Sequence, residues 1–128
     1  MPVVHTDWIT FAKGLLGGSE IANRSAASRA YYGAFHLCKP LADKLPDPVD
    51  PKGMHDRAIR AMSEYPVSQA NRNTAMAIRS LGYKLWQCKS LRTKADYDIH
   101  LAFSQTDAEE TISLAEKAIA SFQTITFP

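Results

Sequence analysis

Arg92 is the residue of this chain whose type and position best suit chemistry on an anion. It follows Leu81, Leu85 and Cys88 at helical spacing, so it extends the apolar stripe of its helix instead of joining the basic face. A guanidinium in that position is paired, exposed at a subunit boundary or used to bind an anion. The alternative is a purely structural role: the helix dipole stabilises a positive charge near the C-terminal end of the helix, and the long side chain can carry that charge to water.

Three polar side chains follow closely and could assist the arginine: Asp96, Tyr97 and His100. An imidazole takes or gives a proton near neutral pH, and an arginine stabilises the charge that builds on a phosphate. The pair therefore supplies what metal-free RNA cleavage requires. Asp96 would orient the arginine or the histidine, and Tyr97 would stack on a base or bond to the phosphate. The alternative for His100 is an ordinary histidine of a surface loop.

A second set of candidate binding residues lies on an earlier predicted helix. Arg29, Tyr32 and His36 fall at positions i, i+3 and i+7, on the side away from the apolar face of that helix. An aromatic ring among basic groups suits base stacking or a phosphate contact. The same stripe equally suits a helix–helix dimer interface or plain surface.

Two further candidates come from the basic middle of the chain. His55 lies one turn before the inward-facing Ile59, so its ring is expected to border the core, with a structural role as the alternative to binding. Lys94 shares the basic side of its helix with Arg72 and Arg79. Both His55 and Lys94 are candidate binding residues.

Charge is distributed unevenly along the sequence. Residues 52–100 hold nine basic and four acidic side chains, whereas residues 101–128 hold one basic and four acidic, within a net charge of +2. One cationic face could meet nucleic acid or an acidic partner. The alternative is that these charges lie on exposed helix faces and serve only solubility.

Several classes of chemistry lack their motifs. The sequence has no glycine-rich phosphate loop, GxSxG or HExxH motif, and no paired Glu-x-x-His of a di-iron bundle. Cys38 and Cys88 show no zinc-site spacing and fall on apolar helix faces, so we expect buried, reduced thiols. We therefore predict no metal and no cofactor.

The fold prediction is an all-α, antiparallel, up-and-down four-helix bundle with an additional short N-terminal helix. The 128 residues, 45% of them hydrophobic, suit a single domain spanning 1–128. Apolar periodicity and end signals predict helices over 7–16, 19–44, 52–64, 68–95 and 107–122.

Particular residues are expected to end or interrupt these helices. Thr6 is the predicted N-cap of the first, and Thr106 with Glu109 has the spacing of a capping box for the last. Pro40 should kink the second helix or end it one turn early. Residues 96–98 are predicted to form a turn. The first residues lack the pattern of a signal peptide and no membrane-spanning run is present, so we expect a cytoplasmic protein that needs no membrane.

These motifs together resemble the HEPN superfamily over about residues 19–122. The run RAYYGAFH at residues 29–36 resembles the second-helix signature, and KGMH at 52–55 resembles the start of the next helix in small prokaryotic members. The run LRTKADYD at 91–98 is similar to the Arg…Ala-Asp-Tyr segment that closes the fourth helix. Residues 106–116 resemble the final helix.

The resemblance implies a helical bundle that forms a homodimer and acts as a metal-independent endoribonuclease. Such enzymes belong to toxin–antitoxin, anti-phage defence or CRISPR-linked systems, and their cleft forms where two copies of an arginine–histidine motif meet. Arg92 matches the family's arginine. His100 follows it after seven intervening residues, where the family has four to six. His36 or His55 could replace it only across a dimer interface.

A second reading of the resemblance is a non-catalytic module. Some HEPN proteins pair with a small nucleotidyltransferase or antitoxin, and others bind nucleotides or RNA without cutting. Arg92 and Asp96 would then form a structural ion pair that locks the end of the helix.

Overall fold

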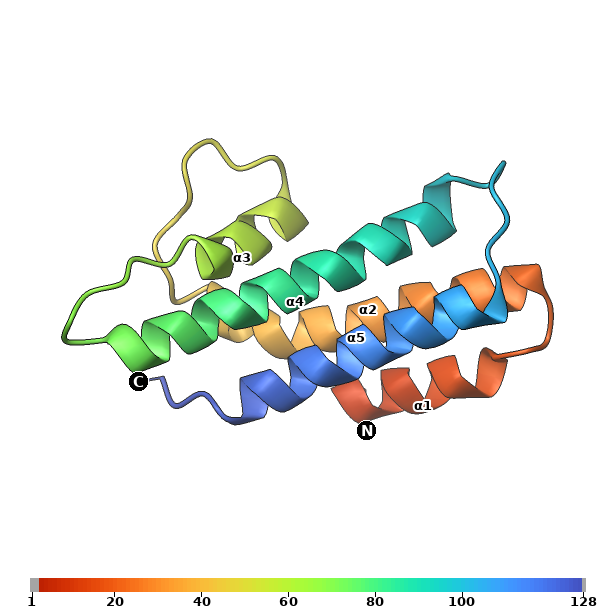
Figure 1. Cartoon of the computed structure of the whole chain (residues 1–128), viewed down its shortest axis with the longest axis horizontal. Helices are drawn as coiled ribbons and strands as arrows, with labels where there is room; N and C mark the ends of the chain where they lie inside the picture. Colours follow the sequence, from red (N-terminus) through yellow and green to blue (C-terminus); the bar gives the residue numbers. More distant parts are fainter. Residues whose placement is uncertain (1–2, 128) are drawn as a thin grey trace.

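Three long helices lie side by side and form the centre of the molecule, and two shorter helices pack against them (Figure 1). The structure is a computed structural model and describes residues 3–127. The helices are α1 (His5–Leu15), α2 (Glu20–Ala42), α3 (Met54–Ser63), α4 (Arg72–Tyr97) and α5 (Gln105–Gln123). No strand forms within residues 3–127, which confirms the predicted all-α bundle with a short N-terminal helix.

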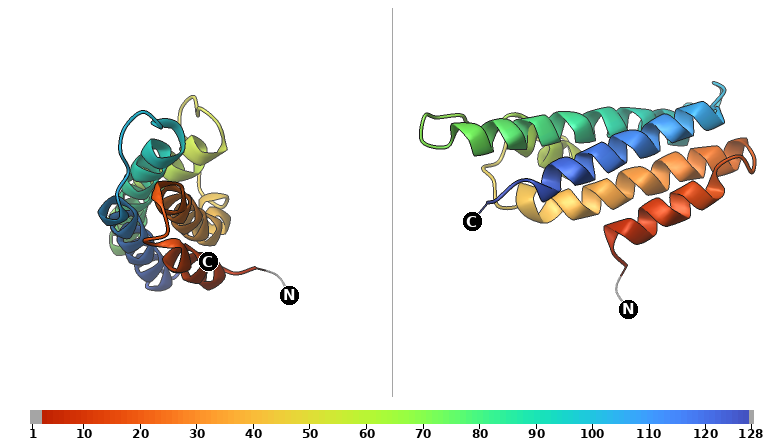
Figure 2. Two further views of the ribbon diagram at one scale, coloured as in Figure 1. Left: turned by 90° about the vertical axis from the view of Figure 1, so that its right-hand side faces the viewer. Right: turned by 60° about the horizontal axis from the view of Figure 1, so that its bottom comes forward.

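The contacts between helices place α2 at the centre. It packs against each of the other four, whereas α1 otherwise touches only α5, and α3 otherwise touches only α4 (Figure 2). Small side chains on α2 allow this close packing, because Ala26, Ala27, Ala30 and Ala34 are fully buried. None of the helices described is both long and apolar enough to cross a membrane.

The N-termini of α1 and α5 correct two predictions. α1 begins at His5, ahead of Thr6, because the carboxylate of Asp7 accepts the Val4 N–H at 2.9 Å. α5 is capped two residues before the predicted box, by Ser104, whose hydroxyl accepts the Asp107 N–H at 3.1 Å. The Asp107 carboxylate accepts the Ser104 N–H in return, so a shorter acid performs the task expected of Glu109.

The C-terminal ends of α4 and α2 also differ from the prediction. Asp96 and Tyr97 belong to α4 and do not form a turn, because the Asp96 carboxylate reaches Arg92 one helical turn earlier. Pro40 lies inside α2, which continues only to Ala42. Proline offers no N–H to the carbonyl four residues earlier, and α2 ends within one turn after it.

Two glycines let helices approach one another closely. A Cβ on Gly82 of α4 would lie 2.5 Å from the backbone nitrogen of Ser63 on α3. A Cβ on Gly33 of α2 would lie 2.8 Å from the Cβ of Trp8 on α1. Gly82 therefore sets how closely α3 lies on α4, which matters because α3 carries His55.

We expect Gly82→Ala to lower the free energy of unfolding by about 1–3 kcal/mol, because the new methyl group forces α3 away from α4. Urea denaturation measures the change. Gly14→Ala is the matched control, since nothing lies within 4 Å of a Cβ there and alanine favours helix. A Gly82→Ala protein as stable as the Gly14→Ala protein would contradict the close contact.

Candidate functional site

The guanidinium of Arg92 lies between α2 and α4 inside a set of aromatic rings. Arg92 is only 9% exposed, and its Nη2 donates a hydrogen bond of 2.7 Å to the hydroxyl of Tyr32. The guanidinium carbon lies 5.2 Å from the Tyr32 ring centre and 5.4 Å from that of Tyr31. The exposed ring of Tyr97 lies 5.8 Å away. These distances suit cation–π attraction, which is stronger where water is excluded.

The Nε of Arg92 stands beside an anion without a proper hydrogen bond to it. Asp96 Oδ2 lies 2.9 Å from this nitrogen, and the side chain of Asp96 is 28% exposed. The contact is close but poorly aligned, so within the described chain the buried Nε lacks a hydrogen-bond acceptor. The hydroxyl of Ser28 donates to the same carboxylate oxygen at 3.3 Å. Asp96 thus compensates the charge of Arg92 and leaves one donor unused.

His55 of α3 joins this group from the other side of Tyr31. Its Nδ1 lies 2.6 Å from the Tyr31 hydroxyl, and its ring centre is 4.2 Å from that of Phe35. Burial, then the charges of Arg92 and Lys89, lower the pKa of His55 below its usual value. Burial raises the pKa of Tyr31, so its hydroxyl keeps its proton at neutral pH. Nδ1 of His55 accepts the hydrogen bond with Tyr31 when the ring proton is on Nε2, and donates it when the ring proton is on Nδ1. We call Tyr31, Tyr32, His55, Arg92 and Asp96 the Arg92 cluster.

The predicted stripe of Arg29, Tyr32 and His36 is partly covered by α1. The ring of Trp8 lies 5.5 Å from that of His36 and 6.3 Å from that of Tyr32. The Arg29 guanidinium lies over both Trp8 and Tyr32, at 5.5 and 5.6 Å. His36 stacks on Tyr32 at 5.9 Å and remains exposed. Tyr32 thus joins the stripe to the Arg92 cluster within one chain.

His100 lies apart from the Arg92 cluster. It is exposed in the segment between α4 and α5, and it forms neither a hydrogen bond nor an ion pair with any residue in 3–127. Lys94 is half-buried on the last turn of α4, and its carbonyl oxygen accepts from Arg24. Most of the sequence candidates come together, namely Arg92, Asp96, Tyr97, Tyr32, His36, His55 and, through its contact with Tyr32, Arg29. His100 and Lys94 do not join them.

Arg24 is a buried arginine that the sequence analysis missed. Its guanidinium donates to carbonyl oxygens at the end of α4 and in the following segment, including Ala95 at 2.9 Å and Leu101. Its carbon also lies 5.6 Å from the ring of the buried Phe103. Arg24 precedes Ala27 and Tyr31 at helical spacing, so the apolar-face argument that singled out Arg92 could have found it. Its position fixes the segment that carries His100.

The two cysteines are buried and free, as predicted. Burial raises the pKa of both Cys38 and Cys88 to about 12. The reactive thiolate form is therefore scarce at neutral pH, and neither thiol is suited to act as a nucleophile.

Comparison with protein-family models, with curated proteins and with solved structures finds no match in any of the three. Among residues 3–127, no group of three or more histidine, cysteine or acidic side chains is placed to hold a metal ion. The function is therefore inferred from the contacts of this chain's own residues.

The lowered pKa of His55 predicts a loss of stability in mild acid. As pH falls below about 6.5, the unfolded chain binds a proton at this residue before the folded chain does. We therefore expect the free energy of unfolding to fall between pH 7 and pH 5, and to fall less in His55→Gln. Urea denaturation at both pH values measures the difference, with His100→Gln as the exposed control. Equal pH dependence in wild type and His55→Gln would contradict the assignment.

We expect Arg24→Met to lower the free energy of unfolding by about 2–3 kcal/mol, because it leaves buried carbonyl oxygens without their charged donor. Amide hydrogen exchange should accelerate across residues 98–103 while α3 keeps its protection. Unchanged exchange in residues 98–103 would show that Arg24 does not hold this segment.

Proposed function

We propose that the chain is a metal-independent endoribonuclease that acts as a homodimer, with Arg92 as the group that stabilises the phosphate. The observation that carries the proposal is the unused Nε donor of Arg92, which stands next to a carboxylate in poor alignment. A phosphate oxygen in place of the Asp96 carboxylate would accept that donor in a charge-assisted hydrogen bond. Tyr32 would hold the other side of the guanidinium in place.

The reaction requires a proton acceptor and a proton donor around this phosphate. The 2′-oxygen of the ribose attacks phosphorus while a base takes its proton, and the bond to the 5′-oxygen breaks while an acid protonates the leaving oxygen. His55 has a lowered pKa, so it is neutral near pH 7 and suits the proton acceptor: with Nδ1–H donated to the Tyr31 hydroxyl, its Nε2 is free to take the proton of the 2′-hydroxyl. His100 is the sequence candidate for the remaining role. Because it forms no hydrogen bond or ion pair with Arg92 in its own chain, we assign that role to His100 of a second copy.

The resemblance to the HEPN superfamily supports the same proposal. Its arginine is matched by Arg92, and its cleft forms between two copies. An enzyme of this kind would serve in a toxin–antitoxin, anti-phage defence or CRISPR-linked system.

A second candidate function is supported by the burial of Arg92. A guanidinium that is 9% exposed, bonded to Tyr32 and 2.9 Å from Asp96, resembles a structural lock between α2 and α4. The chain would then be a non-catalytic module that binds RNA, a nucleotide or a small nucleotidyltransferase partner. Under this alternative, Arg92 contributes to stability and partner binding and to no reaction.

We expect the purified protein to cleave single-stranded RNA in buffer that contains EDTA. Arg92→Ala should reduce the rate by about 10²–10³-fold, as removal of a transition-state donor does, and His55→Gln and His100→Gln should each reduce it by at least about 10²-fold. Gel analysis of a labelled RNA measures the rates. Lys117→Gln, an exposed cation on α5, is the matched control and should cleave normally.

Two outcomes separate the candidate functions. A folded, dimeric Arg92→Ala protein that cleaves at the wild-type rate excludes the nuclease site. A wild type that never cleaves, together with an Arg92→Ala protein that unfolds more easily and loses partner binding, supports the non-catalytic module.

A further inference from the structure

The outer face of α4 exposes two large aromatic rings. Tyr83 is 64% exposed and Trp86 is 55% exposed. They lie three residues apart, so they share one face of the helix and are separated by ~4.5 Å along its axis. Within residues 3–127, neither ring stacks on another aromatic ring or lies under a cation. Both rings therefore have free faces.

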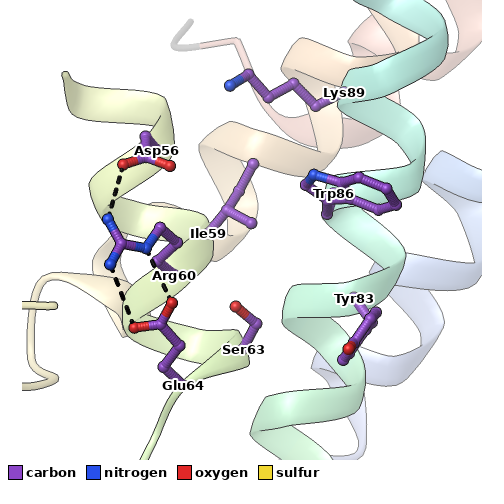
Figure 3. Close-up of a pocket in the computed structure, with 8 residues that line it drawn as sticks. All are labelled: Asp56, Ile59, Arg60, Ser63, Glu64, Tyr83, Trp86 and Lys89. Carbon is purple, nitrogen blue, oxygen red and sulfur yellow. Dashed lines mark hydrogen bonds and ion pairs between the residues drawn. The ribbon is translucent and has the colours of Figure 1, made fainter. Parts of the chain in front are cut away.

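These rings form one wall of a groove between α4 and α3 (Figure 3). The groove has a volume of about 460 Å³, and α3 lines it with Ile59 and Ser63. The acids on the α3 side are already paired, because Arg60 lies 3.2 Å from Asp56 and 2.9 Å from Glu64. One guanidinium shared by two carboxylates leaves this wall with a net charge of −1, so the positive charge of the groove comes from α4.

The cations of α4 are largely uncompensated. Asp96 is the only acid in this helix, and it already lies beside Arg92. The basic residues of α4 are Arg72, Arg79, Lys84, Lys89, Arg92 and Lys94. Lys89 lines the groove, and Arg79 lines a second hollow that shares Tyr83 with it. No described residue forms an ion pair with Lys89 or Arg79, and the buried Nε of Arg79 lacks an acceptor in the same part of the chain. A polyanion complements such a face.

We propose that Arg79, Tyr83, Trp86 and Lys89, which we call the α4 groove surface, bind unpaired, single-stranded RNA. Bases would stack on the free faces of Trp86 and Tyr83, and phosphates would contact Arg79 and Lys89. These four residues extend over ~15 Å of helix, enough for a few nucleotides. Duplex RNA keeps its bases stacked inside the helix and would not use the aromatic rings.

The α4 groove surface leads toward the Arg92 cluster. Tyr97 follows Trp86 by eleven residues, so it lies on the same side of α4, and it is 67% exposed. Its ring lies 5.8 Å from the guanidinium of Arg92. The inference rests on the proposed function in one respect: the strand bound here would be the strand cleaved at Arg92.

Fluorescence anisotropy of a labelled single-stranded RNA of twelve nucleotides tests the proposal. The background is Arg92→Ala in EDTA, so that no cleavage disturbs the binding. We expect Trp86→Leu to weaken binding by about 10-fold, because leucine keeps an apolar side chain but loses the stacking face. Trp86→Phe should retain most of the affinity. Phe11→Leu, at an exposed position on α1, is the matched control.

The charged half of the α4 groove surface is tested by salt dependence. We expect Lys89→Gln and Arg79→Gln each to flatten the plot of log affinity against log salt by about 0.7, and Lys117→Gln to leave the slope unchanged. A duplex of the same sequence should respond equally to Trp86→Leu and Trp86→Phe.

The outcomes distinguish this proposal from the nuclease itself. If the wild type binds RNA through Trp86 but never cleaves it, the proposed nuclease activity is wrong and the proposed RNA binding by the α4 groove surface is supported. If the wild type cleaves RNA but Trp86→Leu binds it with normal affinity, only the proposed RNA binding by the α4 groove surface is wrong. A Trp86→Leu protein that keeps its RNA affinity but changes its oligomeric state in light scattering also overturns it, because the rings then serve a protein interface.

Discussion

The structure depends on how the buried charge of Arg92 is compensated between α2 and α4. An isolated guanidinium between two packed helices would be destabilising, so it needs acceptors and polarizable surroundings. The Tyr32 hydroxyl, the Asp96 carboxylate and the rings of Tyr31 and Tyr32 supply them. The aromatic pair of α2 therefore serves both the core and the charge. This compensation leaves the Nε without a well-aligned acceptor in the described part of the chain.

The position of α3 brings a histidine close to this charge. Gly82 lets α3 pack directly on α4, and His55 at the start of α3 then reaches the Tyr31 hydroxyl. The low pKa of His55 follows from burial and from the nearby guanidinium. A second arginine, Arg24, fixes the C-terminal end of α4, just beyond Arg92, and the segment that carries His100. The two buried arginines, Arg24 on α2 and Arg92 on α4, thus have different roles. Arg92 lies at the candidate site, and Arg24 holds the segment between α4 and α5.

Sequence reasoning reached the fold and the inward position of Arg92, because both follow from helical periodicity. The spacing from Leu81 to Arg92 needs no knowledge of partners, and the buried cysteines follow from the same stripe. Helix ends were less predictable, since Ser104 and Thr106 both fit the same short capping pattern. The meeting of His55 with Arg92 could not be predicted, because it depends on where α3 lies on α4. Arg24 was overlooked although its spacing carried the signal.

The most direct measurement of the central claim is the nuclear magnetic resonance signal of the Arg92 Nε–H during titration with uridine 3′-monophosphate, assigned by comparison with Arg92→Lys. Our account predicts that the signal shifts and that its exchange with water slows as a phosphate oxygen takes the place of the Asp96 carboxylate. Binding of the nucleotide with no change in the Arg92 signal would contradict the account, and would leave Arg92 as a structural residue.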